Sequence, residues 1–95
     1  MRTVCKYRLE ATEVQTLKFH GLKEADSFKE QFLKVDSQKD EAYIWCMVDT
    51  DEDEKEVTVR VVATGEPMPV ISKDNYLGSF MVYNDTLVFH VFLEK

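Results

Sequence analysis

An acidic stretch between residues 49 and 56 is the most chemically distinctive part of the sequence. It combines six carboxylates with one lysine, so it carries a net charge of −5, and the whole chain carries −6. Its acids are Asp49, Asp51, Glu52, Asp53, Glu54 and Glu56. A compact group of carboxylates can occupy a basic protein surface, such as the nucleic-acid channel of a nuclease or polymerase. We therefore interpret this stretch, the acidic segment, as a candidate partner-binding surface.

The alternation of Asp49, Asp51 and Asp53 also copies the opening of an EF-hand calcium loop. The rest of that pattern is missing. The sixth position is Glu54 where the loop requires glycine, and the twelfth is Arg60 where it requires a bidentate glutamate. The flanking residues are also typical of strands rather than helices. We predict no metal site here.

A second candidate site centres on Arg60, the one charged side chain inside the apolar run 57–63. We favour the interpretation that the Arg60 side chain points outward into solvent. The alternative is that Arg60 points into a groove and captures an anionic ligand, because a guanidinium offers a planar fork of donors. The residues that would line such a site with it are Thr64, Tyr43, Trp45 and Tyr76. The segment 64–69, Thr-Gly-Glu-Pro-Met-Pro, is either a stiff strand exit or a rim that receives a partner.

Nucleophilic catalysis would need His20 or His90, the only histidines, beside a thiol or hydroxyl. His90 falls on an apolar strand face, where a hydrogen-bonded structural role is the commoner one. No hydrolase, phosphate-loop, zinc-protease or dinucleotide motif occurs. We predict no enzymatic activity and no cofactor.

Cys5 and Cys46 stand 41 positions apart, outside any CxxC motif, and each lies in an apolar strand-like run. Cys46 shares a strand face with Ile44 and Val48, which is typical of an inert core thiol. We interpret both cysteines as buried free thiols in a reducing cytoplasm.

The elements that position these residues are mainly strands, because β-branched and aromatic residues dominate the apolar runs. We predict strands at 3–9, 14–19, 31–37, 42–48, 57–64, 76–83 and 87–93, with a short helical turn near 22–29. The polar break Asn84-Asp85-Thr86 predicts a hairpin between the last two strands. We also expect a hairpin in the region of the first two strands and antiparallel pairing of 42–48 with 57–64. The run 42–48 is apolar on both faces, which predicts a strand that is covered on both sides or lines a barrel.

Length and composition fit one domain spanning residues 1–95 with a single core built from 42–48, 57–63 and 87–93. The predicted fold is mainly β, a small antiparallel barrel or sandwich of six or seven strands with at most one short helix. The negative net charge and the lack of a basic run argue against direct nucleic-acid binding. No apolar run is long enough for a membrane span, so we expect a soluble protein.

Several short motifs give the sequence a family resemblance. They are Lys6-Tyr7-x-Leu9, Val14-Gln15-Thr16, Trp45-x-x-Val48-Asp49, Thr64-Gly65-x-Pro67-x-Pro69 preceded by Arg60-Val61-Val62, Tyr76-Leu77-Gly78-Ser79-Phe80 and Leu87-Val88-Phe89-His90-Val91-Phe92. Together they resemble a family of small uncharacterised proteins found mainly in bacteriophages and prophages. The resemblance implies a small, mainly β domain of viral origin and brings no activity or ligand with it. The sequence departs from the pattern in the charged stretch 23–34 and in the dense acidic run 51–56.

Three functional hypotheses follow. The first is a non-enzymatic accessory protein of phage type that binds a host protein, with inhibition of antiviral defence as one such role, in the host cytoplasm. Its partner would be a nucleic-acid-binding protein contacted by the acidic segment. The second is a β domain that binds a small anionic molecule, such as a nucleotide signal, through the Arg60 site. The third is a structural accessory protein that forms homo-oligomers through its strand edges.

Overall fold

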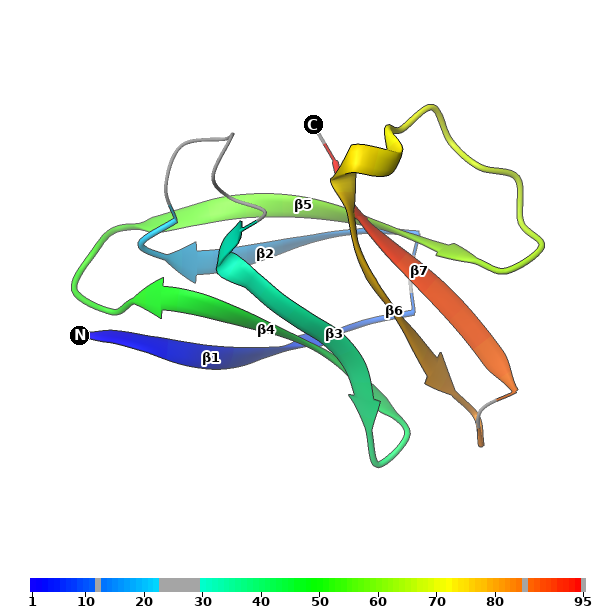
Figure 1. Ribbon diagram of the computed structural model, residues 1–95, viewed down its shortest axis with the longest axis horizontal. Coiled ribbons are helices and arrows are strands. Elements are labelled where there is room, and N and C mark those ends of the chain that lie inside the picture. The colour runs from blue at the N-terminus through cyan, green and yellow to red at the C-terminus, as the bar shows by residue number, and fades with distance from the viewer. Residues whose placement is uncertain (12, 23–29, 85, 95) are drawn as a thin grey trace.

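The strands form two antiparallel sheets in a computed structural model that describes residues 1–11, 13–22, 30–84 and 86–94 (Figure 1). The first sheet has the order β1-β4-β3, with β1 at Arg2–Leu9, β4 at Glu41–Asp49 and β3 at Phe32–Gln38. The second has the order β2-β5-β7-β6, with β2 at Val14–His20, β5 at Glu54–Ala63, β7 at Leu87–Leu93 and β6 at Tyr76–Val82. A 3₁₀ turn, η1, covers Lys73–Asn75. The predicted mainly β fold is confirmed, and the arrangement is sandwich-like because the sheets do not close into a barrel.

The core lies between the two sheets and is built by residues that alternate along each strand. Along β4, residues 42, 44, 46 and 48 are buried, whereas residues 43, 45, 47 and 49 are only half-buried. The largest fully buried side chains are Phe19, Phe80, Ile44, Val59, Val91 and Cys46. The three runs predicted as core all contribute, and β2 and β6 add the two phenylalanines. The side chains between the sheets are therefore the main source of stability.

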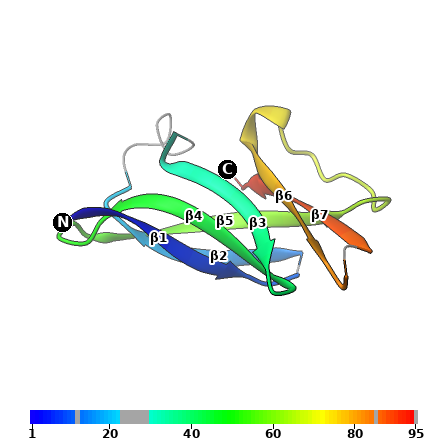
Figure 2. The ribbon, with the colours of Figure 1, turned by 60° about the horizontal axis from the view of Figure 1, so that its bottom comes forward.

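On one side of the sandwich, β3 lies beside β6 (Figures 1 and 2). A bulge in β6 between Tyr76 and Gly78 marks this approach. A Cβ added to Gly78 would lie 2.8 Å from the Cβ of Val35, so this position accommodates only glycine without a shift. The two sheets consequently meet closely along this side.

The last hairpin forms as predicted, with β6 paired to β7 and Val82 opposite Leu87. The chain reverses through Tyr83 and Asn84, which both have positive φ, and asparagine tolerates this conformation better than most residues. A second reversal joins β3 to β4 through Lys39 and Asp40, again with positive φ at both positions. The helical turn predicted near 22–29 falls mainly on residues 23–29, outside the described residues.

Two pairing predictions are wrong. β4 and β5 are not neighbours: β4 pairs with β1 and β3, and β5 pairs with β2 and β7. β1 and β2 do not form a hairpin either, because each belongs to a different sheet. Both connections cross from one layer to the other, and this crossing lets the apolar faces of consecutive strands meet across the core.

The prediction that both faces of β4 are covered is also wrong. Ile44 and Cys46 are fully buried between the sheets, whereas Tyr43 and Trp45 remain partly exposed on the outer face. Lysine side chains lie over those two rings and shield part of them.

Among the residues that the structure describes, no helical segment has the length and hydrophobicity of a membrane span.

Candidate partner-binding site

The acidic segment lies where the chain crosses from β4 to β5, at the end of the sandwich that also holds the start of β1 and the end of β2 (Figure 1). Its connecting part is residues 50–53, because Asp49 is the last residue of β4 and Glu54 is the first of β5. Residues 50–56 are all exposed. The segment therefore presents its carboxylates from a crossing between the two layers.

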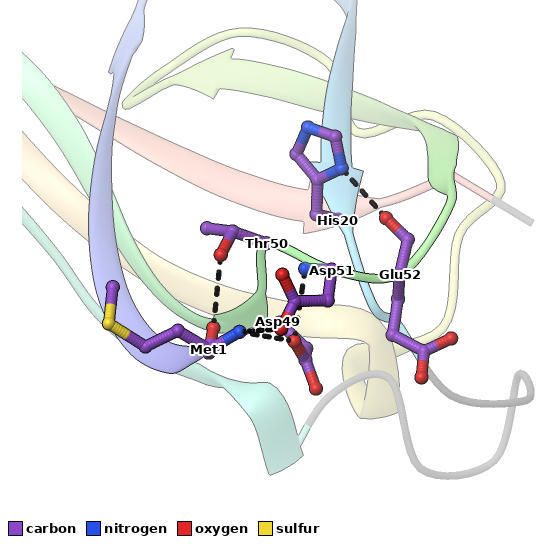
Figure 3. Close-up of polar contacts among 6 residues, drawn as sticks. All are labelled: Met1, His20, Asp49, Thr50, Asp51 and Glu52. Carbon is purple, nitrogen blue, oxygen red and sulfur yellow. Dashed lines mark hydrogen bonds and ion pairs between the residues drawn. The ribbon is translucent and has the colours of Figure 1, made fainter.

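Hydrogen bonds from the backbone and from side chains fix the first half of this connection against Met1, the residue before β1 (Figure 3). The amide of Thr50 donates to the carbonyl of Met1 at 3.0 Å, and the Thr50 hydroxyl donates to the same oxygen at 3.3 Å. The amide of Glu52 donates to the carbonyl of Asp49 at 3.1 Å. The Asp49 carboxylate accepts from the amide of Asp51 at 3.1 Å. The turn is thus closed on itself and tied to the neighbouring strand.

The second half is fixed against the end of β2. The Nδ1–H of His20 donates to the carbonyl of Glu52 at 2.9 Å (Figure 3). The amide of Gly21 donates to the carbonyl of Asp53 at 3.1 Å. Gly21 has a φ of +73°, and a Cβ at this position would lie 2.8 Å from both the Cβ and the amide nitrogen of Asp49. The end of β2 therefore packs against the base of the acidic segment through a position that only glycine fits.

The charges in the segment divide into an anchored pair and an exposed group. The ammonium group of Met1 contacts the carboxylates of Asp49, at 3.1 Å, and Asp51. The hydrogen bond from the Asp51 amide, followed by that from the ammonium group, holds the pKa of Asp49 below its ordinary value. The Glu54 carboxylate lies 3.6 Å from the Nε2 of His20. The remaining acids, Glu52, Asp53 and Glu56, are exposed to solvent.

Among the described residues, no group of three or more histidine, cysteine or acidic side chains is arranged to hold a metal ion.

Arg60 lies on the outer face of the four-stranded sheet, where its guanidinium is paired with carboxylates. Its Nε donates to the Oε2 of Glu94 at 2.6 Å, a second nitrogen donates to Oε1 at 3.2 Å, and Glu13 lies 3.5 Å away. Pro67 and Pro69 line a cavity of about 30 Å³ beside it. An anionic ligand would have to displace Glu94 before it could use this fork of donors.

Tyr43 and Trp45 lie on the opposite outer face, that of the three-stranded sheet. The Nζ of Lys6 is 4.4 Å from the centre of the Tyr43 ring, and the Nζ of Lys34 is 5.5 Å from that of Trp45. The Tyr43 hydroxyl donates to Glu41 at 2.8 Å. The thickness of the sandwich separates these rings from Arg60, so they cannot line one pocket with it.

Thr64 and Tyr76 are brought together by His90, which the strand register places on the same outer face of the four-stranded sheet. The Nε2 of His90 is 2.8 Å from the Thr64 hydroxyl, and Nδ1 is 2.8 Å from the hydroxyl of Ser79. The Tyr76 hydroxyl is 2.6 Å from the same Ser79 oxygen. Both ring nitrogens of His90 therefore contact hydroxyl groups, whereas a catalytic triad has a carboxylate on one of them. The contacts fit the hydrogen-bonded structural role predicted for His90.

Ser79 is not among the site residues that the sequence predicts. The feature that points to Ser79 is its position in the β6–β7 hairpin, where it is the direct cross-strand partner of His90.

Glu94→Gln should lower the melting temperature at neutral pH and lose this effect in acid. Hydrogen bonds from Arg60 hold the pKa of Glu94 below its ordinary value of 4.5. A carboxylate with a lowered pKa in the folded state stabilises the protein above its unfolded-state pKa, and this contribution is lost as the pH falls through the lowered value. Thermal melts of both proteins between about pH 3 and 7 should converge at the acidic end.

The control is Glu10→Gln, which removes a 61% exposed carboxylate 3.8 Å from Arg8. Such pairs contribute little, so this variant should follow the wild type at every pH. A Glu94→Gln protein as stable as the wild type at pH 7 would show that the Arg60–Glu94 pair adds nothing.

Comparison with known proteins gives a family relationship without a function. A family model described as "Domain of unknown function (DUF7352)" matches residues 1–95. No curated protein and no solved structure matches the chain.

Proposed function

The chain belongs to the DUF7352 domain family, whose description assigns no function, and we propose from its geometry that it is a non-enzymatic protein-binding domain. Its acidic segment docks on a positively charged surface of a partner protein. The observation that supports this proposal is that the segment is both densely charged and fixed in shape.

The fixed shape matters because ordering a loop on binding reduces affinity. The connection at residues 50–53 is held by contacts from Met1 on one side and from His20 and Gly21 on the other. The segment is therefore prepared to meet a complementary surface without reorganisation.

The charge supports the same proposal. Exposed acids that repel one another raise the local negative potential, which speeds encounter with a basic partner and makes the association sensitive to salt. The anchored Asp49 stiffens the base of the segment, while Glu52 and Asp53 are exposed at its tip. Charge and position together favour a basic protein surface over a small ligand.

The resemblance to small bacteriophage and prophage proteins favours a host protein as the partner, in the host cytoplasm. A nucleic-acid-binding protein fits best, because its binding channel carries the positive potential that the segment complements. Inhibition of an antiviral nuclease would be one outcome of such binding. The anionic-ligand hypothesis has less support, because Arg60 is already paired and the proposed aromatic residues lie on opposite faces.

Neutralising the exposed acids of the segment should abolish partner binding and leave the fold intact. The test variant is Glu52→Gln/Asp53→Asn/Glu56→Gln, which keeps the anchored Asp49 and Asp51. The wild type serves as bait in a bacterial lysate, and the captured protein is then purified and titrated. We expect binding to be lost while the melting temperature stays within about 5 °C of the wild type, because exposed charges contribute little to stability. Wild-type affinity should fall roughly tenfold between low and moderately high salt.

The matched control is Glu10→Gln/Glu41→Gln/Asp74→Asn, which changes the net charge equally at sites outside the acidic segment. This protein should bind the purified partner as the wild type does. Equal losses in both variants would mean that net charge alone is responsible, and retention of binding by the test variant would remove the acidic segment from the interface. A homo-oligomer in place of a captured protein would favour assembly through strand edges.

A further inference from the structure

The two cysteines, far apart in the sequence, are direct neighbours in the fold. In the antiparallel pairing of β1 with β4, Cys5 is the cross-strand partner of Cys46. Both residues lie on the strand faces that turn toward the core: Cys46 is fully buried and Cys5 is partly buried against it. Their side chains therefore emerge on the same face of the sheet, opposite each other.

This placement matches the requirements of a disulfide. Directly opposed residues of an antiparallel pair have Cα atoms about 4.5 or 5.5 Å apart, depending on the hydrogen-bonding position. Both values fall within the roughly 4.4–6.8 Å that a disulfide spans. The Cβ atoms of such a pair are about 4.5–5.5 Å apart, at or just beyond the roughly 3.5–4.5 Å of a disulfide, so a small local adjustment brings the two sulfur atoms together.

We propose that Cys5 and Cys46 form a dithiol–disulfide pair that joins β1 covalently to β4 under oxidising conditions. In a reducing cytoplasm both remain thiols. The inference is independent of the proposed function, since it depends only on strand register and side-chain face.

The oxidation is a thiol–disulfide exchange with a low-molecular-weight disulfide such as oxidised glutathione. The Cys5 thiolate attacks one glutathione sulfur, forms a mixed disulfide and releases the first glutathione thiolate. The Cys46 thiolate then attacks the sulfur of Cys5, forms the protein disulfide and releases the second glutathione. Two protein thiols are oxidised, one glutathione disulfide is reduced, and the protons of the protein thiols pass to the two glutathione thiols.

The order of these steps follows from exposure. Cys5 lies on β1, an edge strand of its sheet, and it is the more accessible of the two cysteines. Burial, with a smaller effect from the neighbouring Cys5, raises the pKa of Cys46 to about 12. The second step needs the Cys46 thiolate, so it should accelerate as the pH rises.

The crosslink would close a loop that contains β2 and β3, and it would fix the strand from which Met1 contacts the acidic segment. Joining residues so distant in sequence restricts the unfolded chain. We expect the oxidised protein to melt about 10 °C above the reduced protein.

The test incubates the purified protein with oxidised glutathione at mildly alkaline pH and removes the glutathione. It then unfolds the protein in denaturant, blocks the remaining thiols with iodoacetamide and measures the intact mass. The expected product is a monomer without alkylation or glutathione, with the higher melting temperature, and reversible by dithiothreitol. The Cys46→Ala variant should stop at a glutathione adduct on Cys5, and Cys5→Ala should remain unmodified while folded.

A wild-type protein that ends as the Cys5 adduct, as a disulfide-linked dimer, or with both thiols alkylated would overturn the proposal. The wild-type measurement decides the matter even where a cysteine variant fails to fold.

Discussion

Replacing Phe19 by alanine is expected to lower the free energy of unfolding by about 3–5 kcal/mol, the typical loss for a fully buried phenylalanine. Phe19 has no exposed surface. Its ring packs edge-on against Tyr7, with centroids 4.4 Å apart, and against Phe32 at 5.4 Å. It therefore joins side chains from both sheets, and its removal leaves a cavity where the two layers meet.

Denaturant titration measures this loss. The loss is a large part of the roughly 5–15 kcal/mol of stability that a typical single domain has. Two controls separate packing from general sensitivity. Phe19→Leu retains most of the buried apolar volume and should cost markedly less than the alanine variant. Leu33→Ala, at a residue 52% exposed, should change stability by no more than about 0.5 kcal/mol. A Phe19→Ala protein as stable as Leu33→Ala would remove Phe19 from the core.

The position of Phe19 illustrates what the sequence could predict about the fold. The apolar and β-branched residues at 14–19 predict a strand, and its observed extent is Val14–His20. The predicted core comprises the runs 42–48, 57–63 and 87–93 and leaves out β2, where Phe19 is fully buried while Val14 lies 45% exposed on the outer face. Alternation identifies the two faces of a strand, but only packing decides which of them is buried.

Strand pairing shows a similar limit. The last hairpin was predictable because its turn residues and both of its strands are local in sequence. The crossing from β4 to β5 has a connection of only four residues, a length that also suits a hairpin. A hairpin and a crossing would bury the same alternating residues of β4 and β5. The choice between them depends on whether β4 and β5 pair with each other or, as observed, with β1 and β2.

The charge of the candidate site can be predicted from the sequence, but the contacts that hold the acidic segment in place cannot. Six acids within eight residues are visible in any reading of the sequence. The contacts from His20 and Gly21 come from residues some thirty positions earlier, which only the fold brings beside the segment. For the same reason the chain through Ser79, His90 and Thr64 requires the register of β5, β6 and β7.

Gly21→Ala should weaken partner binding strongly although every acidic side chain is retained. The added Cβ meets the Cβ and the amide nitrogen of Asp49 at 2.8 Å, and the φ of +73° is itself unfavourable for alanine. Left-handed strain of about 1–2 kcal/mol and overpacking of about 1–3 kcal/mol add to a destabilisation of about 2–5 kcal/mol. Relief of the clash requires the base of the acidic segment to move, which breaks the hydrogen bond from Gly21 to Asp53.

Gly65→Ala is the matched control, because Gly65 has a φ of +95° and a Cβ there would meet nothing within 4 Å. It carries the backbone strain without the clash, so it should show a smaller destabilisation and wild-type binding. Denaturant titration and titration of the purified partner, carried out where both variants remain folded, compare the two. If the acidic segment acts only through its charge, both variants will bind the partner equally. If its fixed shape contributes, only Gly21→Ala will lose affinity, since it alone displaces the carboxylates without removing any of them.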